Sequence, residues 1–137
     1  MKQHLIAWAV ALLLNLGIAG GVWAQQSEIE GTIGNQIEAF KADDFAQAFT
    51  FATPTLRRYF QSPENFRRMV THGYPMVWRP AEVLYLELAE AGGAWWQKVQ
   101  IIDQKGFSHL LLYRMVETDE GWRIGGVQLL QQADATV

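Results

Sequence analysis

Four runs of aromatic and β-branched residues lie between Glu82 and Leu130, and a short break with a glycine separates each from the next. The three breaks contain Gly92-Gly93, Lys105-Gly106 and Glu120-Gly121. Short breaks of this type join neighbouring strands as hairpins. The second half of the chain is therefore predicted to form an antiparallel meander of four strands.

Neither face of this predicted sheet is cleanly polar, unlike a sheet with one wet side. Alternation places Leu84, Leu86 and Leu88 on one side of the first strand. In the last strand it groups Trp122, Ile124, Gly126, Gln128 and Leu130. A strongly curved sheet would explain two apolar faces, and Gly125-Gly126 predicts the bulge or bend that curves it. Exposed apolar residues on the outer face would indicate a dimer or partner surface.

The first 24 residues have the pattern of a secretory signal peptide. A short basic start precedes an almost wholly apolar run from Leu5 to Val22, and small Ala24 is followed by polar Gln25. Cleavage is predicted between Ala24 and Gln25, which would make the protein periplasmic or secreted. The alternative is an uncleaved anchor, because this run approaches the roughly 20 residues that cross a bilayer.

Removal of 24 of the 137 residues leaves 113, and the loss of Lys2 changes the net charge from −3 to −4. That length predicts one domain over residues 25–131, with a frayed tail over 132–137. The mildly acidic balance offers no footprint for nucleic acid or anionic lipid, so neither nucleic acid nor a membrane is expected as a partner after cleavage.

No metal and no cofactor are expected. The chain has no cysteine, which excludes thiolate metal sites and thiol catalysis. His72 and His109 are the two histidines left after cleavage, and their spacing matches no metal site.

Helix patterns fill the residues before Pro80. The first helix is predicted from Ser27 to Ala42, opened by a capping box of Ser27 and Glu30. Its apolar stripe consists of Ile29, Ile33, Ile37 and Phe40. Gly31 and Gly34 each weaken such a helix by roughly 1 kcal/mol relative to alanine. Either they allow another element to approach closely, or the first turn frays.

Three shorter helices are predicted next, each opened by a capping signal: Asp44 with Gln47, Thr53-Pro54, and Ser62-Pro63. The last of them ends at Gly73. The segment Tyr74 to Pro80 contains two prolines and is predicted as an ordered crossing without helix.

This order of elements resembles the cone-shaped NTF2-like fold, of cystatin-like architecture. Four segments are also similar to a bacterial secreted family known only as domain of unknown function 4864. They are Ile37-Glu38-Ala39-Phe40-Lys41-Ala42-Asp43-Asp44 with Ala48-Phe49; Thr53-Pro54 to Phe60; Ser62-Pro63 with Phe66, Met69-Val70, Tyr74-Pro75, Val77 and Arg79-Pro80; and Gly121-Trp122-Arg123-Ile124. The resemblance covers nearly the whole chain after residue 24.

The resemblance implies an α+β fold with helices packed on a curved four-stranded antiparallel sheet, and export from the cytoplasm. It implies no activity and no functional residues, because the family has no assigned reaction. The family's last strand often carries a cysteine after the Trp-Arg-Ile stretch. Gly126 and Val127 occupy that region here, so no redox role follows.

NTF2-like domains often hold a pocket between sheet and helices, and acid–base chemistry there needs a base and a donor for the developing oxyanion. His109 and Tyr113 share one face of one strand and are the candidate catalytic residues. The alternative places His109 at an outer or edge position and Tyr113 in the core with its hydroxyl satisfied. No aspartate falls in mid-strand, where an isomerase-type base would be expected.

Arg79, Trp95, Gln97 and Tyr59 are the candidate ligand contacts. The Arg79 guanidinium could hold a carboxylate or phosphate, or it could clamp the C-terminal carbonyls of a helix. Trp95 and Trp96 place one indole on each side of the sheet, where one belongs to the core and the other could contact a partner or ligand.

Three hypotheses follow. The first is an exported, non-catalytic NTF2-like module that binds a small apolar ligand or a protein partner, alone or as a homodimer through its sheet. The second is a small lyase or isomerase that uses His109 and Tyr113. The third is a membrane-tethered accessory protein.

Overall fold

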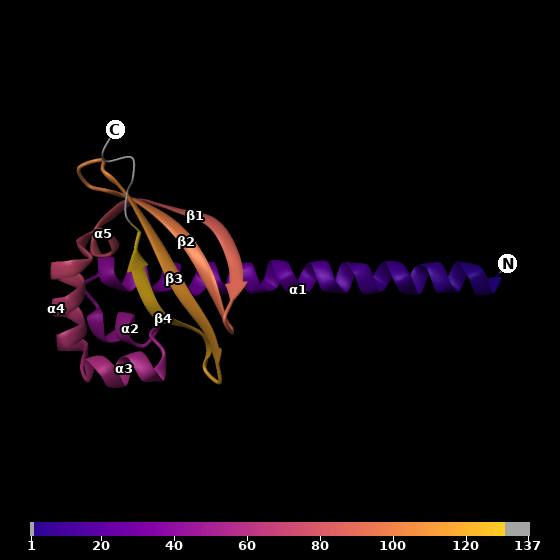
Figure 1. Ribbon diagram of the computed structural model, residues 1–137, viewed down its shortest axis with the longest axis horizontal. Coiled ribbons are helices and arrows are strands. Elements are labelled where there is room, and N and C mark those ends of the chain that lie inside the picture. The colour runs from indigo at the N-terminus through magenta and orange to yellow at the C-terminus, as the bar shows by residue number, and fades with distance from the viewer. Residues whose placement is uncertain (1, 131–137) are drawn as a thin grey trace.

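The computed structural model describes residues 2–130. The predicted tail over 132–137 therefore lies outside the described residues. Five helices precede four strands: α1 (Lys2–Lys41), α2 (Phe45–Phe49), α3 (Pro54–Phe60), α4 (Pro63–Gly73), α5 (Pro75–Trp78), β1 (Pro80–Ala91), β2 (Ala94–Asp103), β3 (Ser108–Thr118) and β4 (Gly121–Leu129). The strands form one antiparallel sheet in sequence order, which confirms the predicted α+β class and the meander (Figure 1).

Glycines make the three hairpin turns as the sequence predicts. Gly92, Gly93, Gly106 and Gly121 all have positive φ angles, between 60° and 103°. Side chains disfavour this backbone region and glycine does not, so these positions set where each strand ends.

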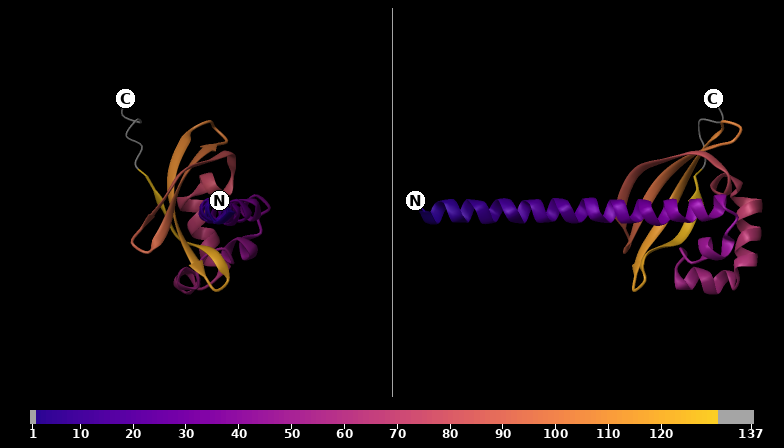
Figure 2. Two further views of the ribbon diagram at one scale, coloured as in Figure 1. Left: turned by 90° about the vertical axis from the view of Figure 1, so that its right-hand side faces the viewer. Right: turned by 180° about the vertical axis from the view of Figure 1, so that it is seen from behind.

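The helices lie on one side of the sheet (Figure 2). The apolar stripe of α1 packs there as predicted: Ile29 and Ile33 are 0% exposed, and Phe40 is 1% exposed. The predicted start of this helix at Ser27 is wrong, because α1 already begins at Lys2 and no proline interrupts the apolar run before Ser27. Across the part of the chain whose side chains are described, no helix is long and apolar enough to cross a membrane.

Gly31 and Gly34 in α1 have different surroundings. At Gly34, a Cβ atom would lie 3.3 Å from the hydroxyl oxygen of Tyr85, so another element does approach closely. At Gly31, a Cβ atom would meet nothing within 4 Å. Only Gly34 therefore has a packing reason to be a glycine.

Gly31→Ala is expected to raise the free energy of unfolding by up to about 1 kcal/mol, the usual gain in helix propensity. Gly34→Ala is expected to gain less, because the Tyr85 hydroxyl must move to admit the methyl group. Urea unfolding of the two variants measures the difference. Equal gains would show that the Tyr85 hydroxyl moves without cost.

The three predicted helix caps are all present. The Asp44 carboxylate accepts a hydrogen bond from the Gln47 amide at 3.1 Å. The hydroxyls of Thr53 and Ser62 accept from backbone amides three residues later, each at 3.2 Å. These caps satisfy amides at the starts of α2, α3 and α4 that have no partner within the helix.

The crossing segment differs from its prediction. Residues Pro75–Trp78 form one helical turn, α5, where the two prolines were expected to prevent helix. Pro75 stands at the start of that turn, a place where its missing N–H costs no hydrogen bond. Pro80 then opens β1.

The predicted face assignment of the first strand is wrong because β1 contains a bulge. Tyr85 pairs with Val99, but Leu88 pairs with Gln97, so one extra residue is inserted between them. Leu88 therefore joins Tyr85 in packing against the core, whereas Leu84 and Leu86 are 39% and 37% exposed on the outer face.

Another bulge lies in β4, where the sequence predicts it. Met115 pairs with Ile124 and Arg114 pairs with Gly126, so Gly125 is the extra residue. The bulge reverses the alternation after it, and Val127 packs against the core. The predicted grouping of Gly126, Gln128 and Leu130 with Trp122 is therefore wrong.

Candidate functional site

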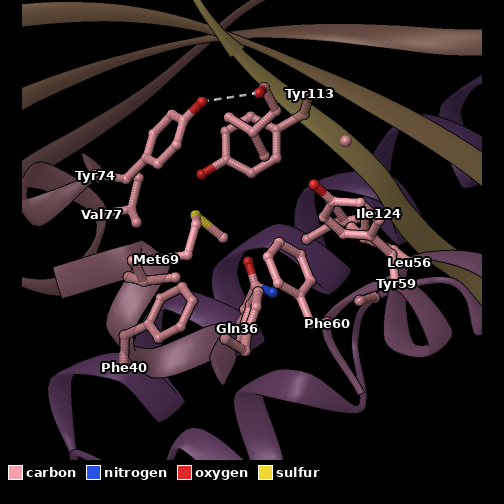
Figure 3. Close-up of a pocket in the computed structure, with 15 residues that line it drawn as sticks. Gln36, Phe40, Leu56, Tyr59, Phe60, Met69, Tyr74, Val77, Tyr113 and Ile124 are labelled. Carbon is pink, nitrogen blue, oxygen red and sulfur yellow. Dashed lines mark hydrogen bonds between the residues drawn. The ribbon is translucent and has the colours of Figure 1, made fainter. Parts of the chain in front are cut away.

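A cavity of about 320 Å³ lies between the helices and the C-terminal half of the sheet. Figure 3 shows the side chains that surround it. Its lining residues come from α1, α3, α4, α5, β3, β4 and the segment before α3: Gln36, Phe40, Ala52, Leu56, Tyr59, Phe60, Phe66, Met69, Val70, Tyr74, Val77, Tyr113, Ile124, Gly126 and Val127. Most of these side chains are apolar, so the cavity suits an apolar molecule.

The location of this cavity depends on how α3 is held beside β4. The segment before α3 is joined to β4, because the Ile124 amide donates to the Phe51 carbonyl at 2.8 Å and the Thr53 amide donates to the Ile124 carbonyl at 2.9 Å. Leu56 and Tyr59 then face the cavity from α3. Tyr59 is 77% exposed, which puts the mouth of the cavity at this helix.

Besides exposed Tyr59, three polar side chains interrupt the apolar lining. The Tyr74 hydroxyl donates to the Val127 carbonyl at 3.3 Å. The Gln36 side-chain amide donates to the Ala48 carbonyl at 3.2 Å. Tyr113 is 1% exposed, and this burial, together with nearby Tyr85 and Tyr74, raises the pKa of its phenol. Tyr113 is therefore protonated at neutral pH and can donate a hydrogen bond.

The structure separates the two candidate catalytic residues. Tyr113 lines the cavity, but His109 is not among the lining residues. The Nε2 atom of His109 lies 2.8 Å from the Asp103 carboxylate at the β2–β3 hairpin. The hydrogen bond from His109 lowers the pKa of Asp103, whose other oxygen accepts from the backbone amides of Lys105 and Phe107. His109 therefore stabilises a turn.

Of the four candidate ligand contacts, the cavity includes only Tyr59. Trp95 is half-buried against the core. Gln97 is 0% exposed, and its side-chain amide donates to the carbonyls of Leu86, Glu87 and Lys98 at 3.0, 3.3 and 2.9 Å. Gln97 thus satisfies carbonyl groups at the β1 bulge.

Arg79 binds the C-terminal carbonyls of a helix, which was one of its two predicted roles. Its guanidinium donates to the carbonyls of Phe40 at 3.2 Å and Lys41 at 3.5 Å, at the C-terminal end of α1. It also donates to the Asp43 carboxylate at 2.8 Å and lies over the Trp78 ring. Hydrogen bonds from Trp78 and Arg79 lower the pKa of Asp43. This network fixes the end of α1 to the start of β1.

Sequence reasoning missed Gln36 and Leu56 as lining residues. Gln36 carried a usable signal, because it lies three residues after Ile33 and four before Phe40, within the apolar stripe of α1. A polar residue at that position indicates a special environment. Leu56 carried no such signal, because its role depends on where α3 packs.

Among the side chains that the structure describes, those of residues 21 and 23–130, no group of three or more His, Cys, Asp or Glu could hold a metal ion.

Fold and cavity together define a small α+β domain with an apolar pocket between its helices and its sheet. The model of one protein family, described as domain of unknown function (DUF4864), matches residues 23–137. The chain therefore belongs to that family, as its sequence segments predict. No curated protein and no solved structure matches the chain.

Proposed function

We propose that this chain is an exported, non-catalytic binding module of the NTF2-like type, which holds a small apolar molecule in the cavity between its helices and its sheet. The observation that carries the proposal is the cavity itself. Its volume of about 320 Å³ falls at the lower end of the range for small-molecule sites, and its lining is mostly apolar.

The chemistry of the lining favours binding over catalysis. Among the described residues that surround the cavity, no side chain carries a carboxylate, an imidazole or an amine. Acid–base catalysis needs such a group within hydrogen-bond reach of the substrate. The phenol of Tyr113 does not serve as a base at neutral pH, because its raised pKa leaves the phenolate form unpopulated.

Two further features support the finer parts of the proposal. Helices packed on one side of a bent antiparallel sheet agree with an NTF2-like cone (Figure 1). The fully buried core of the described residues begins at Ile29, so a cut after Ala24 would leave that core intact. This agrees with a cleaved export signal.

Leu56→Trp is expected to fill the cavity and to weaken binding of the apolar probe p-xylene at least tenfold. Leu56 lies on the short helix α3 and is only half-buried, so the larger side chain can be accommodated without loss of the fold. Chemical shift changes in a titration followed by amide NMR measure the affinity and locate the probe.

Leu84→Trp is the matched control, because the same change is made on the outer face of the sheet, where Leu84 is 39% exposed. It should leave p-xylene binding unchanged. The proposal fails if the wild-type protein binds no probe, or if Leu56→Trp binds it as tightly as the wild type does.

A further inference from the structure

Two buried side chains of the cavity wall each carry a polar atom that has no hydrogen-bond partner among the described residues. One is the hydroxyl of Tyr113, for which no hydrogen bond to the rest of the described chain is found. The other is Oε1 of Gln36, since this 4% exposed side chain uses its nitrogen to donate to the Ala48 carbonyl. That bond also fixes which end of the amide is oxygen, because a carbonyl accepts only from the nitrogen.

Both atoms are directed into the cavity. Figure 3 shows the Tyr113 hydroxyl entering from the sheet and the Gln36 amide entering from the helical side. The third polar group, the Tyr74 hydroxyl, already donates to the Val127 carbonyl at 3.3 Å. Both atoms border the open space of the cavity, so a molecule held there would supply the hydrogen bonds that polar atoms inside proteins almost always make.

The Tyr113 hydroxyl and the Gln36 oxygen require different hydrogen-bonding groups from a ligand. The Gln36 oxygen is an acceptor only, so the ligand must donate to it. The Tyr113 phenol can donate, and burial keeps it protonated by raising its pKa. A single hydroxyl group meets both demands, because it accepts one hydrogen bond and donates another. An ether or ketone can only accept and would leave Gln36 unpartnered.

The charge of the lining residues further restricts the class of ligand. Among the described lining residues no lysine, arginine or histidine faces the cavity. A carboxylate ligand would lose its hydration without a compensating cation and would also meet the Gln36 oxygen. A neutral ligand avoids both costs.

We propose that the cavity binds a neutral alcohol, with its hydroxyl between Tyr113 and Gln36 and its apolar body against the phenylalanine, leucine and methionine side chains. This inference rests on the proposed binding function. A volume of about 320 Å³ admits on the order of ten non-hydrogen atoms, at about 30 Å³ for each as in liquid water. A medium-chain or monocyclic alcohol has this size.

Three probes of similar size test the proposal by isothermal titration calorimetry: 1-octanol, its isomer 1-methoxyheptane, and the octanoate anion. The wild-type protein is expected to bind 1-octanol roughly tenfold more tightly than the ether, because the ether leaves a buried acceptor unsatisfied. Octanoate is expected to bind more weakly than 1-octanol.

Tyr113→Phe removes the donor from which both 1-octanol and 1-methoxyheptane can accept, so it should weaken binding of the two probes by similar factors of about three- to tenfold. Tyr85→Phe is the matched control. The Tyr85 hydroxyl donates to the Glu30 carbonyl at 3.2 Å and lies outside the cavity, so this variant should bind both probes as tightly as the wild-type protein does. Gln36→Met removes the acceptor and keeps the length of the side chain, so the preference for 1-octanol over 1-methoxyheptane should fall to about twofold or less.

The possible outcomes separate the two proposals. If none of the three probes binds the wild-type protein, the binding function itself fails. If 1-octanol and the ether bind equally well, or octanoate binds best, the cavity is a binding site but the alcohol inference is wrong. The inference is also overturned if the preference survives unchanged in Gln36→Met, or if Tyr113→Phe binds both probes as tightly as the wild type does.

Discussion

Phe66→Ala is expected to lower the free energy of unfolding by about 3–5 kcal/mol, as for other large aromatic side chains removed from a core. Phe66 is 4% exposed and joins α4 to three other rings. Its ring centre lies 5.8 Å from that of Phe40, 5.4 Å from that of Phe49 and 5.5 Å from that of Phe60. Truncation would enlarge the neighbouring cavity and remove all three ring contacts.

Denaturant unfolding followed by tryptophan fluorescence measures this loss. Phe107→Ala is the matched control, because Phe107 is 65% exposed and its removal should change the free energy of unfolding by no more than about 0.5 kcal/mol. A loss below about 1 kcal/mol in Phe66→Ala would contradict the position of this ring at the centre of the aromatic cluster. Since small domains have about 5–15 kcal/mol in total, the expected loss is a large part of the stability.

The predictions that proved correct rest on local chemistry. A positive φ angle at Gly106 or Gly121 and a hydrogen bond from a backbone amide to the Ser62 hydroxyl each involve residues close together in sequence. The stripe of α1 is also local, because its spacing alone brings Ile29 and Ile33 to one face. Turns, caps and stripes can therefore be predicted from the sequence.

The predictions that failed depend on contacts between distant residues. The β1 bulge accompanies hydrogen bonds from Gln97 to the carbonyls of Leu86 and Glu87 across the neighbouring strand. Nothing in the alternation of β1 indicates that Leu88 changes face. The helical turn after Pro75 was missed for a different reason, since proline was read as a helix breaker although it fits the first position of a helix.

The predictions for the candidate site also divide into those that rest on local sequence and those that depend on distant contacts. Alternation could place Tyr113 and His109 on one face of one strand. Which of the candidates share a cavity could not be predicted, because the cavity depends on how α3 docks against β4. Arg79 illustrates the point, since its two alternatives differ only in whether Phe40 and Asp43 lie within reach, and the fold brings both there.

Removal of residues 25–34 of α1 is the second change with a large expected effect on stability. A chain that begins at Gln25 is expected to unfold cooperatively, whereas a chain that begins at Asn35 is expected not to fold. The shorter chain loses Ile29 and Ile33, both 0% exposed. Burial of each isoleucine contributes about 1.5–3 kcal/mol to the free energy of unfolding. Loss of both would therefore remove a large part of the roughly 5–15 kcal/mol available to a domain.

Polar contacts would be lost with them. The Trp122 indole donates to the Glu28 carboxylate at 3.0 Å, and the Tyr85 hydroxyl donates to the Glu30 carbonyl at 3.2 Å. Both donors belong to the sheet, so the shorter chain would leave an apolar face of the sheet and two polar groups without their partners. Residues Trp23 to Glu28, by contrast, are exposed or half-buried, and a start at Gln25 removes no buried side chain from them.

Near-ultraviolet circular dichroism and amide NMR dispersion distinguish the two chains. The chain that begins at Gln25 should show a sharp thermal transition and dispersed amide signals, and the chain that begins at Asn35 should show neither. Ile33→Ala in the longer chain provides an intermediate case with an expected loss of about 2–5 kcal/mol. A folded, cooperative chain from Asn35 would show that Ile29 and Ile33 are not needed for the core.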